Sequence, residues 1–238
     1  MKISKVIATT ISLLAIASQG LAADAFDKSV ANIALLQIKE VQTDVGITAA
    51  QRTQLNKHAD WFNAESKKIN DQAATYVQKN QQPPKSLTDK FVKLNNDMAN
   101  KVVGVLTAGQ LKRLREITLQ NAGPVAMMDP TVAKKIGLSD SQLKSIRSRF
   151  DSDAKKADGI QEKAFKPIID KYKAKKPKDD AEAKKLSEAY AKEMDAAGKK
   201  IAPQLNKIQS DFSAFLKKTL STKQDSAWKA LLGKPFKG

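Results

Sequence analysis

The sequence Leu106-Thr107-Ala108-Gly109-Gln110 is one of four copies of a short pattern in this chain of 238 residues. Each copy has an aliphatic residue, a hydroxyl residue, two variable positions and a glutamine. The other copies are Ile47-Thr48-Ala49-Ala50-Gln51, Leu138-Ser139-Asp140-Ser141-Gln142 and Leu220-Ser221-Thr222-Lys223-Gln224. A Ser or Thr followed three residues later by Gln is typical of a capping box, in which both side chains bond to free N–H groups at a helix start. The pattern therefore predicts four helix N-termini and a structural, non-catalytic role for these residues.

The four copies fall into two registers, which indicate an internal duplication. Val45-Gly46-Ile47-Thr48 matches Ile136-Gly137-Leu138-Ser139 at an offset of 91 residues, from position 47 to position 138. The second and fourth copies are 114 residues apart, from position 106 to position 220. We therefore expect two related units, residues 26–123 and 124–238, and the second unit has 23 more residues between its two motifs.

Composition and apolar spacing predict an all-α fold. Aromatic residues make up 5% of the chain and glycine occurs ten times, which disfavours a β-rich fold. Apolar residues recur at helical spacing after each motif, so each unit should contain a long helical hairpin with short end helices. We also expect Ser86 to cap a helix and Pro167 and Pro203 to kink two others. The apolar stripes are narrow, so the hairpins should form a thin, elongated layer.

The N-terminal residues have the anatomy of a secretory signal peptide. Two lysines precede the apolar stretch Val6–Ala17, and small residues follow it. We expect residues 1–22 to be a signal peptide, with cleavage after Ala22 or Ala25, and the mature chain to be periplasmic or secreted. A membrane anchor is the alternative, but twelve apolar residues are fewer than the roughly 20 that a spanning helix needs. No other segment is long and apolar enough, so we expect no transmembrane span.

Composition also excludes several kinds of active site. The chain has no cysteine and a single histidine, His58. Thiol catalysis, disulfides and cysteine-ligated metals are therefore excluded, and a Ser-His-Asp hydrolase is disfavoured. A metal site at His58 would need carboxylates or a second chain to complete its ligands. Since no phosphate-binding loop or nucleophile elbow is present, we predict that the protein is not an enzyme and holds no cofactor.

Two carboxylate pairs have both a functional and a structural interpretation. Asp151 with Asp153, and Asp179 with Asp180, are candidates for a calcium site or an acid–base pair. Neither pair has the glycine and distal glutamate of a calcium loop. We therefore expect these four carboxylates to be solvated in charge-rich helices or turns.

The methionine pair and the large aromatic residues allow similar alternatives. Met127 and Met128 are candidates for a copper or client contact, but they fit packing before a turn better. Trp61, Phe62 and Trp228 are expected to make core or inter-unit contacts and not a stacking platform.

The chain is strongly basic, and this charge limits the choice of partner. Its formal net charge is +17 and its sequence pI is 9.8. Lysine greatly outnumbers arginine, and lysine suits long-range attraction of anions better than the bidentate recognition of nucleic acids. The predicted export of the chain also argues against a nucleic-acid partner. Anionic envelope polymers or lipid headgroups fit better. Lysines mixed with exposed apolar groups would also attract non-native proteins, whereas a simply solvated lysine face is the plain alternative.

The two Leu-Thr-x-x-Gln-type motifs in each unit, the signal peptide, the helical pattern and the basic charge together resemble the Spy/CpxP-like family of periplasmic proteins. The resemblance implies that the motifs cap a thin, curved helical hairpin. It also implies a cradle of two chains whose concave face binds non-native proteins without ATP. Because this chain has two units in tandem, we expect it to form an elongated cradle as a monomeric pseudo-dimer or as a homodimer.

The resemblance implies three functions in order of preference. The first is an exported holdase chaperone or envelope-stress protein whose partners are unfolded or aggregation-prone exported proteins. The second is a CpxP-like adaptor that binds a sensor domain or an anionic envelope polymer. The third is a metal-responsive protein. The sequence assigns no client-binding residue.

Overall fold

The computed structural model describes residues 24–175 and 177–237, so the predicted signal peptide lies outside the described residues. The predicted all-α fold is confirmed, because these residues form helices and no strand. No helix among them is long and apolar enough to cross a membrane. The elements are α1 (Ala25–Val30), η1 (Ile33–Gln37), α2 (Lys39–Val45), α3 (Ala49–Gln78), α4 (Lys85–Val105), α5 (Ala108–Ala122), η2 (Gly123–Met128), α6 (Pro130–Ile136), α7 (Asp140–Lys173), α8 (Asp180–Thr219) and α9 (Thr222–Leu232).

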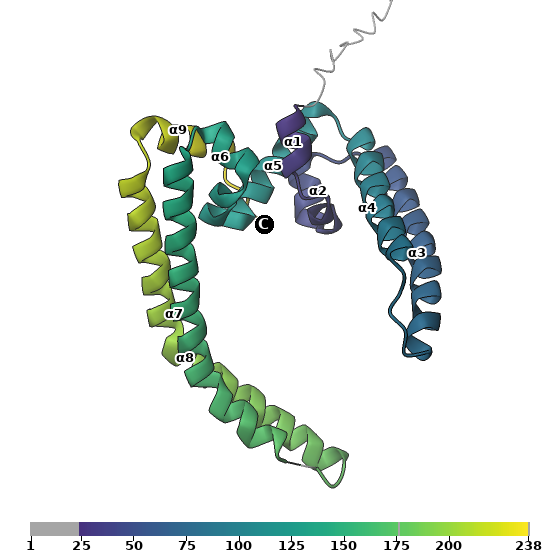
Figure 1. Ribbon diagram of the computed structural model, residues 1–238, viewed down its shortest axis with the longest axis vertical. Helices are drawn as coiled ribbons and strands as arrows, with labels where there is room; N and C mark the ends of the chain where they lie inside the picture. Colours follow the sequence, from purple (N-terminus) through teal and green to yellow (C-terminus); the bar gives the residue numbers. More distant parts are fainter. Residues whose placement is uncertain (1–23, 176, 238) are drawn as a thin grey trace, which may run out of the picture.

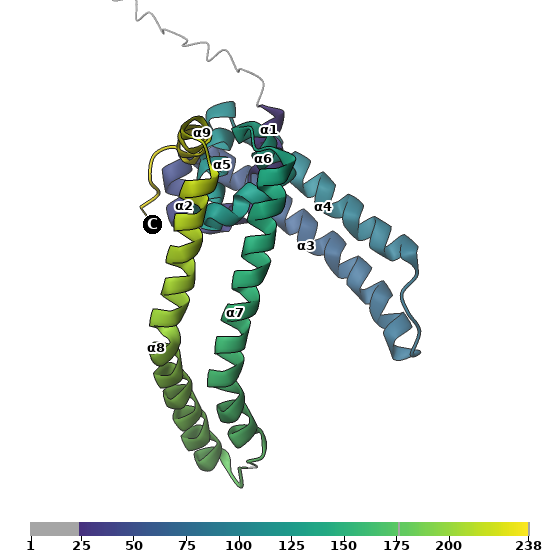
Figure 2. The same cartoon turned by 60° about the vertical axis from the view of Figure 1, so that its left-hand side comes forward.

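Two helical hairpins extend from a cluster of short helices (Figure 1). We call the α3–α4 hairpin the first arm, the α7–α8 hairpin the second arm, and the remaining helices the hub. Figure 1 shows both arms on the same side of the hub, so that the ribbon has the outline of an arch. The second arm is the longer and is bent part of the way along its length. The turned view of Figure 2 shows that the arms leave the hub in different directions.

After α1, the two halves of the chain repeat the same order of elements. A 3-10 helix and a seven-residue helix, α2 or α6, end at a glycine with a φ of 75°, Gly46 or Gly137. This left-handed backbone is readily adopted by glycine, which has no Cβ. An arm and a final short helix follow in each half. The added residues of the second half lie in its arm, since α7 has 34 residues against 30 in α3, and α8 has 40 against 21 in α4.

Each half has its own cluster of buried apolar side chains. The first cluster contains Val41, Val45 and Leu114, and the second contains Val132, Ile136 and Trp228. These residues correspond in pairs at the offsets of the duplication, 91 for the first two pairs and 114 for the third. The repeated sequence pattern is therefore repeated in the packing, and Trp228 and Met127 lie in the core, as predicted.

Helix α5 lies between the two clusters and belongs to both. Leu114 and Ile117 pack in the first cluster, whereas Leu119 packs in the second. The same helix buries charged residues that bind to other elements. Arg115 Nε donates to Asp27 Oδ1 of α1 at 2.9 Å, so that α1 is held to α5. Buried charges of this kind are tolerated only when they are paired.

The expectation about Ser86 is wrong, and the two prolines lie inside long helices of the bent second arm (Figure 1). Ser86 is not a cap, because α4 begins one residue earlier, at Lys85, with Pro84 as its N-cap and no side-chain bond. The fixed φ of proline already gives Pro84 the extended conformation that an N-cap needs. Helices α7 and α8 continue through Pro167 and Pro203 as single helices.

The burial pattern predicts which apolar side chains hold the fold together. Ile146 in α7 is completely buried, whereas Ile169 in the same helix is 44% exposed. We expect Ile146→Ala to lower the free energy of unfolding by about 2–5 kcal/mol, because it leaves a cavity in the second cluster. Chemical denaturation checks this, with Ile169→Ala as the matched control. Equal losses for the two variants would contradict the assignment of the core.

Candidate functional site

All four sequence motifs begin helices, and each forms a complete capping box. Thr48, Thr107, Ser139 and Ser221 are the N-caps of α3, α5, α7 and α9. In the first copy, the N–H of Gln51 donates to Thr48 Oγ1 at 3.2 Å, and the N–H of Thr48 donates to Gln51 Oε1 at 3.0 Å. The aliphatic residue before each cap packs in or against a cluster, as Ile47, Leu106, Leu138 and Leu220 do.

The two glutamines of the first half also bind each other, although 59 residues separate them. Gln51 Nε2 donates to Gln110 Oε1 at 2.7 Å, and Gln110 Nε2 donates to Gln51 Oε1 at 2.9 Å. Each amide gives its second N–H to a backbone carbonyl at the end of another helix. Gln51 donates to Val105, the last residue of α4, and Gln110 donates to Gly46, the C-cap of α2.

The second half contains the same arrangement at the equivalent residues. Gln142 and Gln224 exchange two hydrogen bonds of 2.9 Å each. Gln142 also donates to Thr219, the last residue of α8, and Gln224 donates to Gly137, the C-cap of α6. Each arm is therefore bound at its base by two glutamines that bond to each other, and we call such a set a glutamine pair.

The glutamine pair explains why the last position of the motif is an amide. Each side chain makes two donor bonds and accepts two, which uses both N–H groups and both lone pairs. A glutamate would complete the capping box equally well, but it has no N–H group to donate to its partner or to a carbonyl. The motif alone predicted the caps and missed this pairing, because nothing in a five-residue pattern indicates which two copies meet.

The arms bury few of their side chains. Helix α3 has no buried residue, α4 has three, α7 has two and α8 has three. Large apolar side chains therefore contact water on both arms, namely Val77 (63% exposed), Val92 (54%), Ile169 (44%) and Phe91 (40%). Two antiparallel helices have only one shared face, so residues beside that face cannot be covered. Trp61 and Phe62 are half-buried in this layer.

Aromatic contacts hold the second arm together along its length. The rings of Phe150 and Phe212 lie 6.1 Å apart near the hub, and those of Tyr172 and Tyr190 lie 5.3 Å apart near the tip. Glu193 accepts hydrogen bonds from Lys171 Nζ at 2.6 Å and Tyr172 Oη at 3.0 Å. These bonds lower the pKa of Glu193. Paired aromatic rings of this kind stabilise the hairpin beyond their burial.

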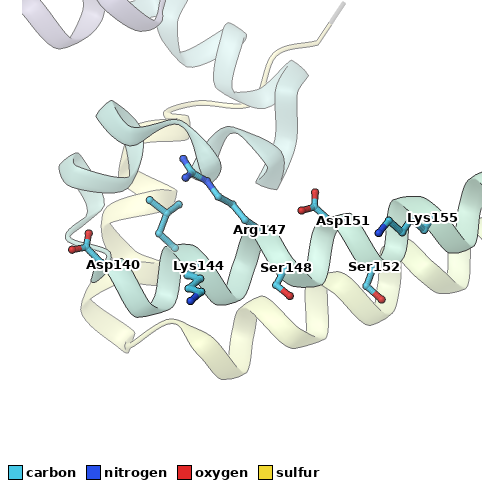
Figure 3. A pocket seen from close by; sticks show the side chains of 8 residues that line it. Asp140, Lys144, Arg147, Ser148, Asp151, Ser152 and Lys155 are labelled. Carbon is cyan, nitrogen blue, oxygen red and sulfur yellow. The ribbon is translucent and has the colours of Figure 1, made fainter.

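One face of α7 forms an open groove where the second arm leaves the hub (Figure 3). Its volume is about 690 Å³ and its lining comes from α7 alone. Arg147 Nη2 donates to the carbonyl of Met128 at 2.7 Å, which joins the arm to the hub. Figure 3 shows Arg147 and Asp151 on one side of α7 and Ser148 and Ser152 on the other. The lining combines acidic, basic and hydroxyl side chains, so the groove offers a polar surface.

The expectation that both members of the Asp151–Asp153 pair are solvated is wrong for Asp153. Asp151 is exposed in the groove, whereas Asp153 is 5% exposed and accepts hydrogen bonds from Arg149 at 2.6 Å and Lys156 at 3.2 Å. Residues two apart on a helix do not face each other, so they form no carboxylate pair. Burial alone would raise the pKa of Asp153, but the bonds from Arg149 and Lys156 outweigh it and lower the pKa.

The remaining candidates do not converge on a site in the described residues. Asp179 caps α8 by accepting a hydrogen bond from the N–H of Glu182 at 2.7 Å. His58 is half-buried on α3. Within residues 24–175 and 177–237, no group of three or more His, Asp or Glu side chains is arranged to hold a metal ion.

Comparisons with protein-family models, curated proteins and solved structures found no match to this chain.

The glutamine pair predicts a specific effect of an isosteric substitution. We expect Gln110→Glu to lower the free energy of unfolding by about 1–3 kcal/mol, because the carbonyl of Gly46 and Gln51 Oε1 both lose their donor. Thermal unfolding followed by circular dichroism measures the loss. Gln54→Glu, at an exposed position of α3, is the control and should change stability little. If Gln110→Glu were as stable as this control, the glutamine pair would make no contribution to the free energy of unfolding.

The lowered pKa of Asp153 predicts a pH-dependent contribution to stability. A carboxyl whose pKa is lower in the folded chain than its ordinary value of 3.8 stabilises the fold at neutral pH. That contribution is lost as the pH falls through the folded pKa. We therefore expect Asp153→Asn to be less stable than the parent chain at pH 7 and the difference to shrink below pH 4, about its ordinary pKa. Asp151→Asn is the matched control, and an equal pH profile for both variants would refute the prediction.

Proposed function

We propose that this chain is an exported, ATP-independent holdase that binds non-native proteins on its two arms, by contact alone and without catalysis. The observation that carries the proposal is the contrast in burial between the arms and the hub. Helix α3 buries none of its 30 residues, whereas the hub helix α5 buries seven of its 15. The hub therefore supplies the stable core, and the arms supply apolar surface that no part of the described chain covers.

The exposed apolar residues have the properties that a holdase surface needs. Val77, Phe91 and Val92 lie on the first arm and Ile169 lies on the second. Attraction between apolar surfaces is not directional and gains about 25 cal/mol per Å² buried, so such residues can hold many different sequences. Contacts with three or four side chains contribute only a few kcal/mol, which keeps binding reversible.

The charge of the arms supports the same function. Lysine and arginine outnumber aspartate and glutamate in both arms. Lys90 and Lys93 flank the exposed pair Phe91 and Val92 in the sequence. A basic surface attracts acidic unfolded chains over a long range before apolar contacts form. The predicted signal peptide and the resemblance to the Spy/CpxP-like family support this activity in the periplasm.

An aggregation assay tests the proposed function directly. We expect the purified chain without residues 1–22 to suppress aggregation of a denatured test protein at near-stoichiometric ratios in the absence of ATP. Suppression should weaken at about 1 M salt, where charges are screened beyond roughly 3 Å. No suppression at any ratio would refute the holdase. A pull-down that then recovered one folded partner would favour the CpxP-like adaptor instead.

Substitution of exposed residues on the first arm tests client binding without removing buried contacts that stabilise the fold. The double variant Val77→Ser/Val92→Ser removes two exposed valines from the first arm. Each substitution removes about 1 kcal/mol of apolar contact, so the two together should raise the amount of chain needed for half-suppression roughly tenfold to thirtyfold. Val125→Ser is the matched control, because Val125 is 40% exposed but lies in η2 of the hub. Equal effects of both variants would show that the arms are not the binding surface.

A further inference from the structure

The C-terminal residues 233–237, which we call the tail, leave the second half of the chain and bind to the first. Arg113 Nη1 of α5 donates to the carbonyl of Lys234 at 2.7 Å. Gln120 Nε2 of the same helix donates to the carbonyls of Leu232 at 2.5 Å and Lys234 at 2.8 Å, and Gln120 Oε1 accepts from the N–H of Phe236 at 2.7 Å. One helix of the first half thus binds the backbone of the tail on both sides of Pro235.

The side chain of Phe236 packs against the first apolar cluster, away from the second half to which it is linked in the chain. It lies in a groove of about 330 Å³ whose other walls include Leu35, Ile38 and Ile117. These residues come from η1, the residue that follows it, and α5. The tail therefore makes polar contacts through its backbone and one apolar contact through its side chain.

The turn into the tail requires glycine. Gly233 has a φ of 63° and a ψ of −153°, a region that is essentially restricted to glycine. A Cβ added there would overlap the side-chain carboxylate of Glu116. Glu116 cannot easily move aside, because it is buried and its Oε2 accepts from Arg113 Nη1 at 2.9 Å. Arg113 Nη2 in turn lies 2.5 Å from Asp44 Oδ2 of α2, so the tail rests on a network within the first half.

We propose that the docking of the tail in the groove between η1 and α5 sets the angle between the two arms. Helix α9 carries the effect because it is held at both ends. At its start, Gln224 binds Gln142 at the base of the second arm. At its end, Arg115 donates to the carbonyl of Leu231, and the tail continues into the groove. Release of the tail leaves the end of α9 held to α5 by the bond from Arg115 and by the packing of Trp228, and we infer that this weaker hold lets the second arm turn relative to the first half. This role goes beyond the proposed holdase function and does not depend on it.

Spin labelling tests the proposal on the full chain. Because the chain has no native cysteine, labels attach only at the cysteines that are introduced. Ala74→Cys in α3 and Ala191→Cys in α8 place labels on exposed positions of the two arms. The parent chain should give one narrow distribution of distances between the labels. We expect Gln120→Ala/Phe236→Ala to lose that narrow peak, whereas the control Lys237→Ala, at an exposed tail position, should keep it.

A single label at Lys237→Cys, in chains that lack the two arm labels, reports whether the tail has been released. The motion of this label should be more restricted in the parent chain than in Gln120→Ala/Phe236→Ala. A tail that stays immobile in the variant would show that these contacts do not hold it. A mobile tail with an unchanged distribution between the arms would show that it does not set their angle. Either result overturns the proposal.

Gly233→Ala provides an independent variant if Gln120→Ala/Phe236→Ala does not fold by circular dichroism. It leaves every contact residue in place and prevents only the close turn beside Glu116. We expect it to release the tail and to lose the narrow peak in the same way. Retention of both parental spectra by this variant would overturn the proposal.

Discussion

A pair of glutamine side chains lies where each arm meets the hub, and its hydrogen bonds join the ends of four helices. Gln51 and Gln110 in the first half, and Gln142 and Gln224 in the second, use all of their donors and acceptors on each other, on a cap and on a helix end. A helix start and a helix end both leave backbone groups without partners. The pair satisfies groups of both kinds at once, so it fixes where two helices begin and where two others stop.

Helix α5 performs a second joining task, between the two halves. Its apolar residues divide between the clusters, and its charged residues bind α1, α2 and the tail. Buried charges carry a desolvation cost that hydrogen bonds must offset, so each of these contacts is sensitive to position. Because α5 makes position-sensitive contacts on several sides, it has little freedom to shift. The hub can therefore support two long arms although the arms themselves bury little surface.

Each arm is only two helices thick, so it depends on the hub for stability and leaves apolar side chains exposed to water. A hairpin of two helices has one shared face, and the narrow stripes of α3 and α7 fill that face without covering Val77 or Ile169. Rings such as Phe150 with Phe212, and Tyr172 with Tyr190, supply local stability at intervals along the second arm. Buried contacts are thus concentrated in the hub and at the base of the arms, and four of the six exposed large apolar residues in the described part of the chain lie on the arms. This distribution is the basis of the proposed binding function.

The local features of this protein could be read from the sequence, and the contacts between distant segments could not. The caps at Thr48, Thr107, Ser139 and Ser221, the all-α class and the register of the duplication depend on residues within one or two helical turns. The extent to which Asp153 is buried, the pairing of Gln110 with Gln51 and the docking of Phe236 on α5 depend on where whole helices lie. Gln110 reaches a carbonyl 64 residues away and Arg113 reaches one 121 residues away. A short pattern carries no information about partners at such distances, so these contacts arise from the packing of the helices in three dimensions.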